Sequence, residues 1–215
     1  MTSPAPRRPV KRIVLISVLV LSLAIVGVVA AIVVPILTHS NTGSSGQTIP
    51  TNFESSSTAK GADDRTRTIA VKTTDGKPAE LAELSPGDEV VVTGEGFDAG
   101  LGIYVGFCAI PPSPDVKPGP CLGGIPEGAE QGAAAAQEAL SSAWITNDWA
   151  WKSFATQGYD DRDLGSFSVR LTVPEPTVEG LDCTQSRCAI STRTDHTAMK
   201  ERVQDMLLPF AYRAN

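Results

Sequence analysis

Cysteine is the residue type with the clearest chemical role in this chain, which has four cysteines and only two histidines. The cysteines fall into two neighbouring pairs, Cys108 with Cys121 and Cys183 with Cys188. Neither pair has the CxxC spacing of a zinc site, and the only histidine near them is His196, so a metal centre is disfavoured. An even number of cysteines in an exported chain implies disulfides. Three connectivities are formally possible, of which the local pairing needs the least chain closure.

Catalytic constellations are poorly represented. His39 follows a long apolar run, and His196 lies beside Asp195 in a polar stretch. A Ser-His-Asp site would have to be built on His196 alone, whereas an isolated histidine in a polar loop is usually solvated. The sequence therefore predicts no enzyme.

Two further motifs fail to predict a cofactor or a metal. The glycine-rich stretch 94–100 lacks both the GxxxxGK and the GxGxxG spacing of phosphate-binding loops. The acidic stretch 160–163 lacks the DxDxDG order and the distal glutamate of a calcium-binding EF-hand loop. We expect neither a cofactor nor a bound metal ion.

Aromatic residues give the sharpest functional signal. The three tryptophans lie close together, and two more aromatic residues follow them, at Trp144, Trp149, Trp151, Phe154 and Tyr159. Aromatic side chains dominate binding hot spots, but they also pack a long insertion onto a scaffold. Both interpretations stay open, and we expect any ligand or partner to engage this stretch.

The N-terminal segment has the features of a membrane anchor. Residues 13–37 carry no charge and are long enough to span a bilayer as a helix. Residues 1–12 hold Arg7, Arg8, Lys11 and Arg12, which predicts a cytoplasmic tail by the positive-inside rule. A cleaved signal peptide is the alternative, but the apolar run continues beyond the small residues at 29–31. We expect an uncleaved signal-anchor with the C-terminal domain outside the cell.

The segment after the apolar run is polar. Between residues 38 and 60, 11 of 23 residues are Ser or Thr, which predicts a flexible linker that we extend to residue 66. Of the 18 basic residues, four precede the apolar run, whereas all 24 acidic residues follow residue 53, so the outer part carries a net charge of −10. That charge repels phosphate backbones, and we expect no nucleic-acid partner.

Residues 67–215 are expected to form one all-β domain. Period-two alternation of apolar residues and turn signals mark its strands at 68–72, 89–93, 103–108, 167–173, 188–192 and 207–212. Pro209 lacks an N–H group, which places the last strand at a sheet edge or a bulge. Residues 122–164 form an insertion, in which the Ala-rich stretch 128–142 is compatible with a short helix.

The order of strands, glycine turn and cysteine pairs is similar to that of the neocarzinostatin family. The resemblance rests on GDEVVVTGEGFDAGLGIYVGFCA (87–109), Cys121, GSFSVRLTV (165–173) and LDCTQSRCAIST (181–192). It implies a seven-stranded immunoglobulin-like sandwich of actinobacterial origin with one disulfide per local loop, here Cys108–Cys121 and Cys183–Cys188. Antibiotic-carrying members hold an enediyne chromophore in a cleft at one end, and membrane-anchored relatives look like envelope proteins.

Three departures limit what the resemblance implies for function. The chain has an apparent anchor, an insertion over 122–164, and a segment at 199–204 that does not match the pocket-forming end of the family. We therefore expect a cell-envelope binding module for a small apolar ligand, lipid or glycan. The alternatives are an envelope protein–protein interaction or structural module and an enediyne-binding apoprotein. A deep apolar cleft would favour a ligand, and a flat aromatic patch a protein partner.

Overall fold

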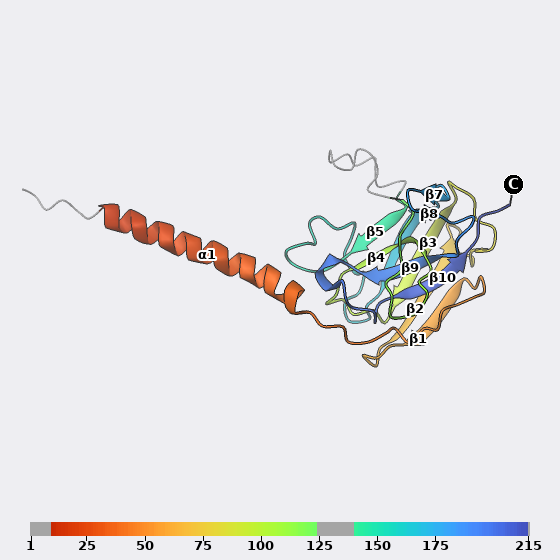
Figure 1. Cartoon of the computed structure of the whole chain (residues 1–215), viewed down its shortest axis with the longest axis horizontal. Helices are drawn as coiled ribbons and strands as arrows, with labels where there is room; N and C mark the ends of the chain where they lie inside the picture. The colour runs from red at the N-terminus through yellow and green to blue at the C-terminus, as the bar shows by residue number, and fades with distance from the viewer. Residues whose placement is uncertain (1–9, 124–139, 215) are drawn as a thin grey trace, which may run out of the picture. The chain divides into compact units, whose positions relative to one another are not determined.

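The computed structural model describes residues 10–123 and 140–214 and divides the chain into two compact units, at Thr38 and His39 (Figure 1). The first unit contains helix α1 (Val10–Thr38), whose segment Arg12–Thr38 is long and apolar enough to cross a membrane. A signal sequence passes the same test, so the helix is suited to either role. The second unit contains every strand in the described part of the chain.

The first sheet of the outer unit is antiparallel and four-stranded. Its order is β1 (Ser56–Lys60), β2 (Thr66–Thr73), β3 (Glu89–Glu95) and β6 (Phe167–Thr172). Along β6 the apolar residues Phe167, Val169 and Leu171 are buried, whereas Ser168 and Arg170 are exposed. The strict alternation fixes which face of the sheet covers the core.

The second sheet is also antiparallel and four-stranded. Its order is β10 (Met206–Phe210), β9 (Cys188–Thr194), β4 (Ile103–Ala109) and β5 (Ser142–Ile145). Pro209 lies on β10 at the edge of this sheet, which confirms the predicted position of the proline. A separate hairpin joins β7 (Thr177–Val178) to β8 (Leu181–Asp182), and the short 3-10 helix η3 (His196–Ala198) follows β9.

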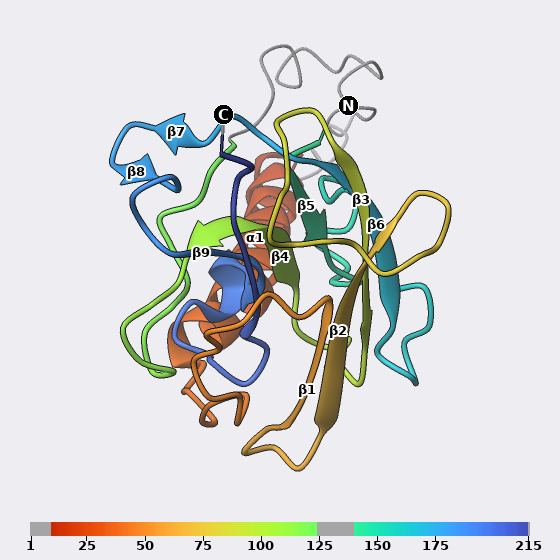
Figure 2. The same ribbon diagram turned by 90° about the vertical axis from the view of Figure 1, so that its right-hand side faces the viewer.

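One apolar core lies between the two sheets, which form two layers (Figure 2). Val92 of β3 belongs to it, as do Phe107 of β4 and Ile190 of β9. The ring of Phe97 meets the ring of Phe167 edge to face, with centroids 5.2 Å apart. An all-β domain with antiparallel sheets is therefore confirmed. The described residues place eight strands in the two main sheets, where seven were expected in all.

The predicted flexible linker over residues 38–66 is wrong where the segment forms strand. Strand β1 lies within it and pairs with β2. The side chain of Gln47 donates from Nε2 to the carbonyl of Leu207 and accepts from its N–H, both at 2.8 Å. The side-chain amide of Gln47 thus bonds both backbone groups of Leu207, as a residue on a neighbouring strand would. The prediction failed there because the Ser/Thr-rich segment has few large apolar residues, while distant partners satisfy its polar groups.

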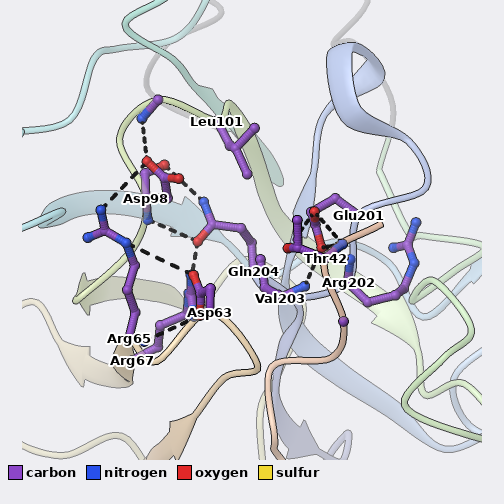
Figure 3. Close-up of polar contacts among 12 residues, drawn as sticks. Thr42, Asp63, Arg65, Arg67, Asp98, Leu101, Glu201, Arg202, Val203 and Gln204 are labelled. Atoms are coloured by element: carbon purple, nitrogen blue, oxygen red, sulfur yellow. Dashed lines mark hydrogen bonds and ion pairs between the residues drawn. The ribbon is translucent and has the colours of Figure 1, made fainter. Parts of the chain in front are cut away.

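A buried polar network joins this N-terminal part to the segment before β10 (Figure 3). Arg67 is fully buried and donates from Nε to Gln204 Oε1 at 2.8 Å and from Nη1 to Asp63 Oδ1 at 2.9 Å. Gln204 also bonds the backbone N and O of Asp98, both at 3.0 Å. Gln204, in the segment 199–204 that departs from the neocarzinostatin pattern, therefore links strand β2 to the loop that carries Asp98.

The predicted insertion over 122–164 begins beside the core and contributes to a sheet. Residues 124–139 lie outside the described residues, and with them most of the stretch that was compatible with a helix. The described end of that stretch, residues 140–142, is not helical. Beyond it β5 completes the second sheet by pairing with β4, so this part of the insertion belongs to the framework.

Both predicted disulfides, Cys108–Cys121 and Cys183–Cys188, are confirmed. They close loops with sequence separations of 13 and 5 residues. In the loop-entropy account the longer loop contributes about 3 kcal/mol and the shorter about 2 kcal/mol to the free energy of unfolding.

Removal of the longer loop's disulfide should therefore cost more stability than removal of the shorter one. We expect the double substitution Cys108→Ala/Cys121→Ala to lower the free energy of unfolding by about 3 kcal/mol, because the unfolded chain regains the freedom of the longer loop. Urea denaturation followed by tryptophan fluorescence measures this loss. The matched control is Cys183→Ala/Cys188→Ala, and a larger loss in the control would contradict the entropic ranking.

Candidate functional site

A row of three side chains crosses the outer face of the second sheet. In the strand register Tyr104 of β4 lies opposite Trp144 of β5 on one side and opposite Arg193 of β9 on the other. The rings of Tyr104 and Trp144 have centroids 5.9 Å apart, and the guanidinium carbon of Arg193 lies 5.8 Å from the Tyr104 ring centroid. Two aromatic faces and a cation are thus presented side by side on rigid strands.

Two more rings extend this row. His196 of η3 packs edge-on against Trp144 and Trp151, with centroid distances of 5.1 and 4.8 Å. Its Nδ1 lies 3.0 Å from the hydroxyl of Tyr104, within hydrogen-bond distance. We call Tyr104, Trp144, Trp151 and His196 the aromatic cluster. The expectation of a solvated loop histidine was therefore wrong, because three aromatic residues surround the imidazole.

Asp195 holds the aromatic cluster in place. Its carboxylate is fully buried and accepts bonds from Trp144 Nε1 at 2.9 Å and from Thr197 N at 2.8 Å. A Cβ atom at Gly102 would collide with this carboxylate, so the position requires glycine. The indole of Trp144 is therefore oriented before any ligand arrives, which reduces the entropy lost on binding.

A cleft adjoins the row on the same face of the sheet. It has a volume of about 180 Å³ and lies between the Tyr104 ring and the Cys108–Cys121 disulfide. Ser142 of β5 and Arg193 of β9 line it as well. Gly106, on the strand between them, contributes no side chain, and the space above the strand stays open.

Cationic groups border this surface. Burial lowers the pKa of Arg193, although the charge of Asp205 opposes the shift. Burial and the nearby charges of Arg193 and Arg202 lower the pKa of Lys117 to about 8. Burial, reinforced by the charge of Asp195, raises the pKa of Tyr104, so its hydroxyl keeps its proton at neutral pH. The face therefore offers a cation beside a neutral hydrogen-bonding phenol.

The five aromatic residues singled out in the sequence do not form one site. Trp144 and Trp151 belong to the aromatic cluster. Tyr159 is buried in the core and donates from its hydroxyl to the carbonyl of Leu101 at 3.0 Å. Trp149 and Phe154 are exposed outside the cluster.

Tyr104, Arg193 and His196 complete the surface, and the sequence did not single them out as binding candidates. The alternation of residues 103–108 already placed Tyr104 on the face opposite Ile103 and Val105. Arg193 and His196 gave no such signal, because their place beside Tyr104 depends on the pairing of β4 with β9.

The geometry can bind a ligand that combines an apolar or ring-shaped face with a hydroxyl or anionic group. Aromatic rings cover the apolar part, and Arg193 meets the polar part. Within the described residues no group of three or more His, Cys, Asp or Glu side chains could hold a metal ion. No protein-family model, curated protein or solved structure matches this chain.

Proposed function

We propose that this protein is a membrane-anchored, extracytoplasmic binding module without catalytic activity, built on an immunoglobulin-like sandwich of the neocarzinostatin kind. Its ligand is a small molecule with an apolar face, such as a lipid or a glycan, carrying a hydroxyl or anionic group. The row Trp144–Tyr104–Arg193 beside the cleft is the observation that carries the proposal.

The composition of the site supports a small ligand. Binding sites for small molecules combine aromatic walls with a few fixed polar groups, and here Asp195 fixes Trp144 while His196 supports Tyr104. The three side chains of the row lie on strands, which favours recognition of the ligand by a preformed surface. The charge of Arg193 next to an aromatic ring favours ligands with a carboxylate, a phosphate or polarised hydroxyl groups.

The N-terminal segment supports the proposed location. Helix α1 is long and apolar enough to span a bilayer, and four basic residues precede the apolar run. The positive-inside rule then puts the sandwich outside the cell. Two disulfides in the outer unit agree with an oxidising compartment, and the resemblance to actinobacterial proteins suggests the cell envelope.

A protein partner is the second candidate, because the cleft is small. Its volume of about 180 Å³ is below the ~300–1,000 Å³ of most ligand pockets. The aromatic cluster beside it would then act as the centre of a flatter interface. An enediyne chromophore is a further candidate that rests on the family resemblance alone.

Removal of the Arg193 charge should abolish ligand retention. We expect the chain purified from its own host membranes to carry a bound small molecule, visible as a mass adduct in native mass spectrometry. The substitution Arg193→Met keeps the side-chain volume and removes the cation, so the adduct should be lost.

The matched control is Arg170→Met, because Arg170 is exposed on the other sheet and pairs with Glu89 at 3.2 Å. The control should keep the adduct. A small-molecule adduct that survives Arg193→Met and also Tyr104→Ala would refute the proposed site. An adduct with the mass of a second protein would instead favour the interaction module.

A further inference from the structure

The outer unit fixes the chain soon after the apolar helix ends. The carboxylate of Glu201 is fully buried and accepts from Thr42 N at 3.1 Å and from Thr42 Oγ1 at 2.9 Å (Figure 3). His39 Nε2 lies 3.1 Å from the same oxygen. Burial opposes ionisation of Glu201, but hydrogen bonds from Val203 N, Thr42 and Arg202 N outweigh it and lower the pKa. The carboxylate is therefore charged at neutral pH and holds Thr42.

This attachment limits how far the outer unit can lie from a membrane. Helix α1 ends at Thr38, and Thr42 is already held by Glu201. A fully extended chain gains about 3.5 Å per residue, so the four steps from 38 to 42 span about 14 Å at most. If α1 is anchored in a bilayer, the surface of the outer unit around Thr42 stays next to the lipid headgroups.

Exposed apolar side chains gather close to this attachment. Trp149 is 62% exposed and Phe154 is 75% exposed, both in the connection between β5 and β6. Met199, directly after η3, is 62% exposed. We call these three residues the tether-side patch. Such exposure of large apolar side chains in one region usually marks an interaction surface.

Contacts within the outer unit tie the tether-side patch to the attachment point. Trp151, between the two exposed aromatics, packs on His196 with ring centroids 4.8 Å apart. Glu201 follows η3 and donates its N–H to the carbonyl of Ala198 at 2.9 Å. The β5–β6 connection and η3 lie at one end of the sandwich (Figure 1). The patch and Thr42 therefore share that end.

The polar residues around the patch suit a headgroup region. Lys152 and Lys200 are exposed within the same two segments, Lys152 two residues before Phe154 and Lys200 directly after Met199. Asp148 is exposed there too, but its Oδ1 accepts the N–H of Ala150 in a local turn. Lysines beside apolar side chains are typical of segments that bind at the surface of anionic membranes.

We propose that the tether-side patch inserts into the interfacial region of the outer leaflet and docks the sandwich on the bilayer. The proposal rests on the anchoring part of the proposed function. Tryptophan favours the membrane–water interface, where its ring is buried and its N–H stays hydrated. Docking restricts the tumbling of the outer unit and leaves the outer face of β4, β5 and β9 at a defined height above the lipid.

Tryptophan fluorescence in brominated lipid tests this directly, because α1 contains no tryptophan. The full chain is reconstituted into vesicles of phosphatidylcholine and phosphatidylglycerol, with or without bromine on the acyl chains near the headgroup. We expect the brominated lipid to quench part of the emission. The substitution Trp149→Phe should remove that quenching, while the emission of the partly buried Trp144 and Trp151 persists.

A matched control moves the reporter away from the patch. Val178→Trp in the Trp149→Phe background places an exposed tryptophan on β7, in a hairpin distant from the β5–β6 connection (Figure 1). Its emission should be equal in both lipids. Equal emission of the unmodified chain in the two lipids would overturn the proposal, as would quenching that survives Trp149→Phe.

Flotation separates this proposal from the anchor on which it rests. A chain that floats with the vesicles but shows no quenching is anchored and undocked, which refutes docking alone. A chain that does not float refutes the anchor, and docking with it. Unquenched chains that cross-link as dimers through the patch would show that a second copy covers it, which also overturns the proposal. The loss of the ligand adduct in the Arg193→Met variant tests the proposed function and does not depend on any of these three outcomes.

Discussion

Arg67→Ala should lower the free energy of unfolding by about 3–5 kcal/mol, the usual cost of breaking a buried ion pair by removing one partner. Arg67 is fully buried, and its guanidinium bonds both Asp63 and Gln204 (Figure 3). The substitution removes these bonds and leaves a cavity between the sandwich and the loop that carries Asp63. Chemical denaturation of the full chain in detergent, followed by tryptophan fluorescence, measures the loss.

The control for Arg67, which lies on β2, is Arg170→Ala on strand β6 of the same sheet. Arg170 pairs with Glu89 at 3.2 Å, but both side chains are exposed, so the pair should contribute only about 0–1 kcal/mol. The two substitutions remove the same charge and differ in burial. Equal losses in the two variants would contradict a structural role for the buried network.

Acid titration gives a second readout of the Arg67–Asp63 ion pair. The hydrogen bond from Arg67 lowers the pKa of Asp63 below its ordinary value, and burial opposes this only in part. A carboxyl group with a lowered folded-state pKa stabilises the fold above its unfolded pKa of about 3.9. That contribution disappears as the pH falls through the folded-state pKa. The Arg67→Ala variant should lack this part of the acid sensitivity below about pH 4.

The sequence was informative where structure depends on neighbouring residues. Strand β6 followed from the alternation of Phe167, Val169 and Leu171, since a half-buried strand needs one apolar face. The disulfides join cysteines that are close in the chain, and the resemblance to a known family implied the same local pairing. Pro209 marked an edge strand because it has no N–H to donate.

Local patterns were insufficient where polar groups are satisfied by distant partners. Gln47 bonds Leu207 across 160 positions, and Thr42 bonds Glu201 across 159, so the Ser/Thr-rich segment resembles a linker until the whole fold is known. The candidate site had the same difficulty. Trp144 was visible from composition, but its row with Tyr104 and Arg193 exists only in the register of β5, β4 and β9.

Tyr159→Ala should lower the free energy of unfolding by about 3–5 kcal/mol, the usual cost of removing a buried aromatic ring. Tyr159 is only 6% exposed and packs edge-on against Phe167, with ring centroids 6.3 Å apart. Burial raises the pKa of its hydroxyl, which remains protonated and donates to Leu101 O at 3.0 Å. Trp149→Ala should change stability by no more than about 0.5 kcal/mol, since the indole is mostly exposed.

Two further variants divide the Tyr159 effect into its parts. Tyr159→Phe keeps the ring and removes the hydroxyl, so the loss should be about 1 kcal/mol for the hydrogen bond to Leu101. Trp149→Ala should keep the stability of the sandwich while abolishing quenching by brominated lipid. If Trp149→Ala were as damaging as Tyr159→Ala, the exposed tryptophan would be part of the fold and could not serve a membrane surface. The same short stretch of sequence thus supplies Tyr159 to the core and Trp149 to the surface. The sequence marks both as aromatic, and only their burial in the fold separates the two roles.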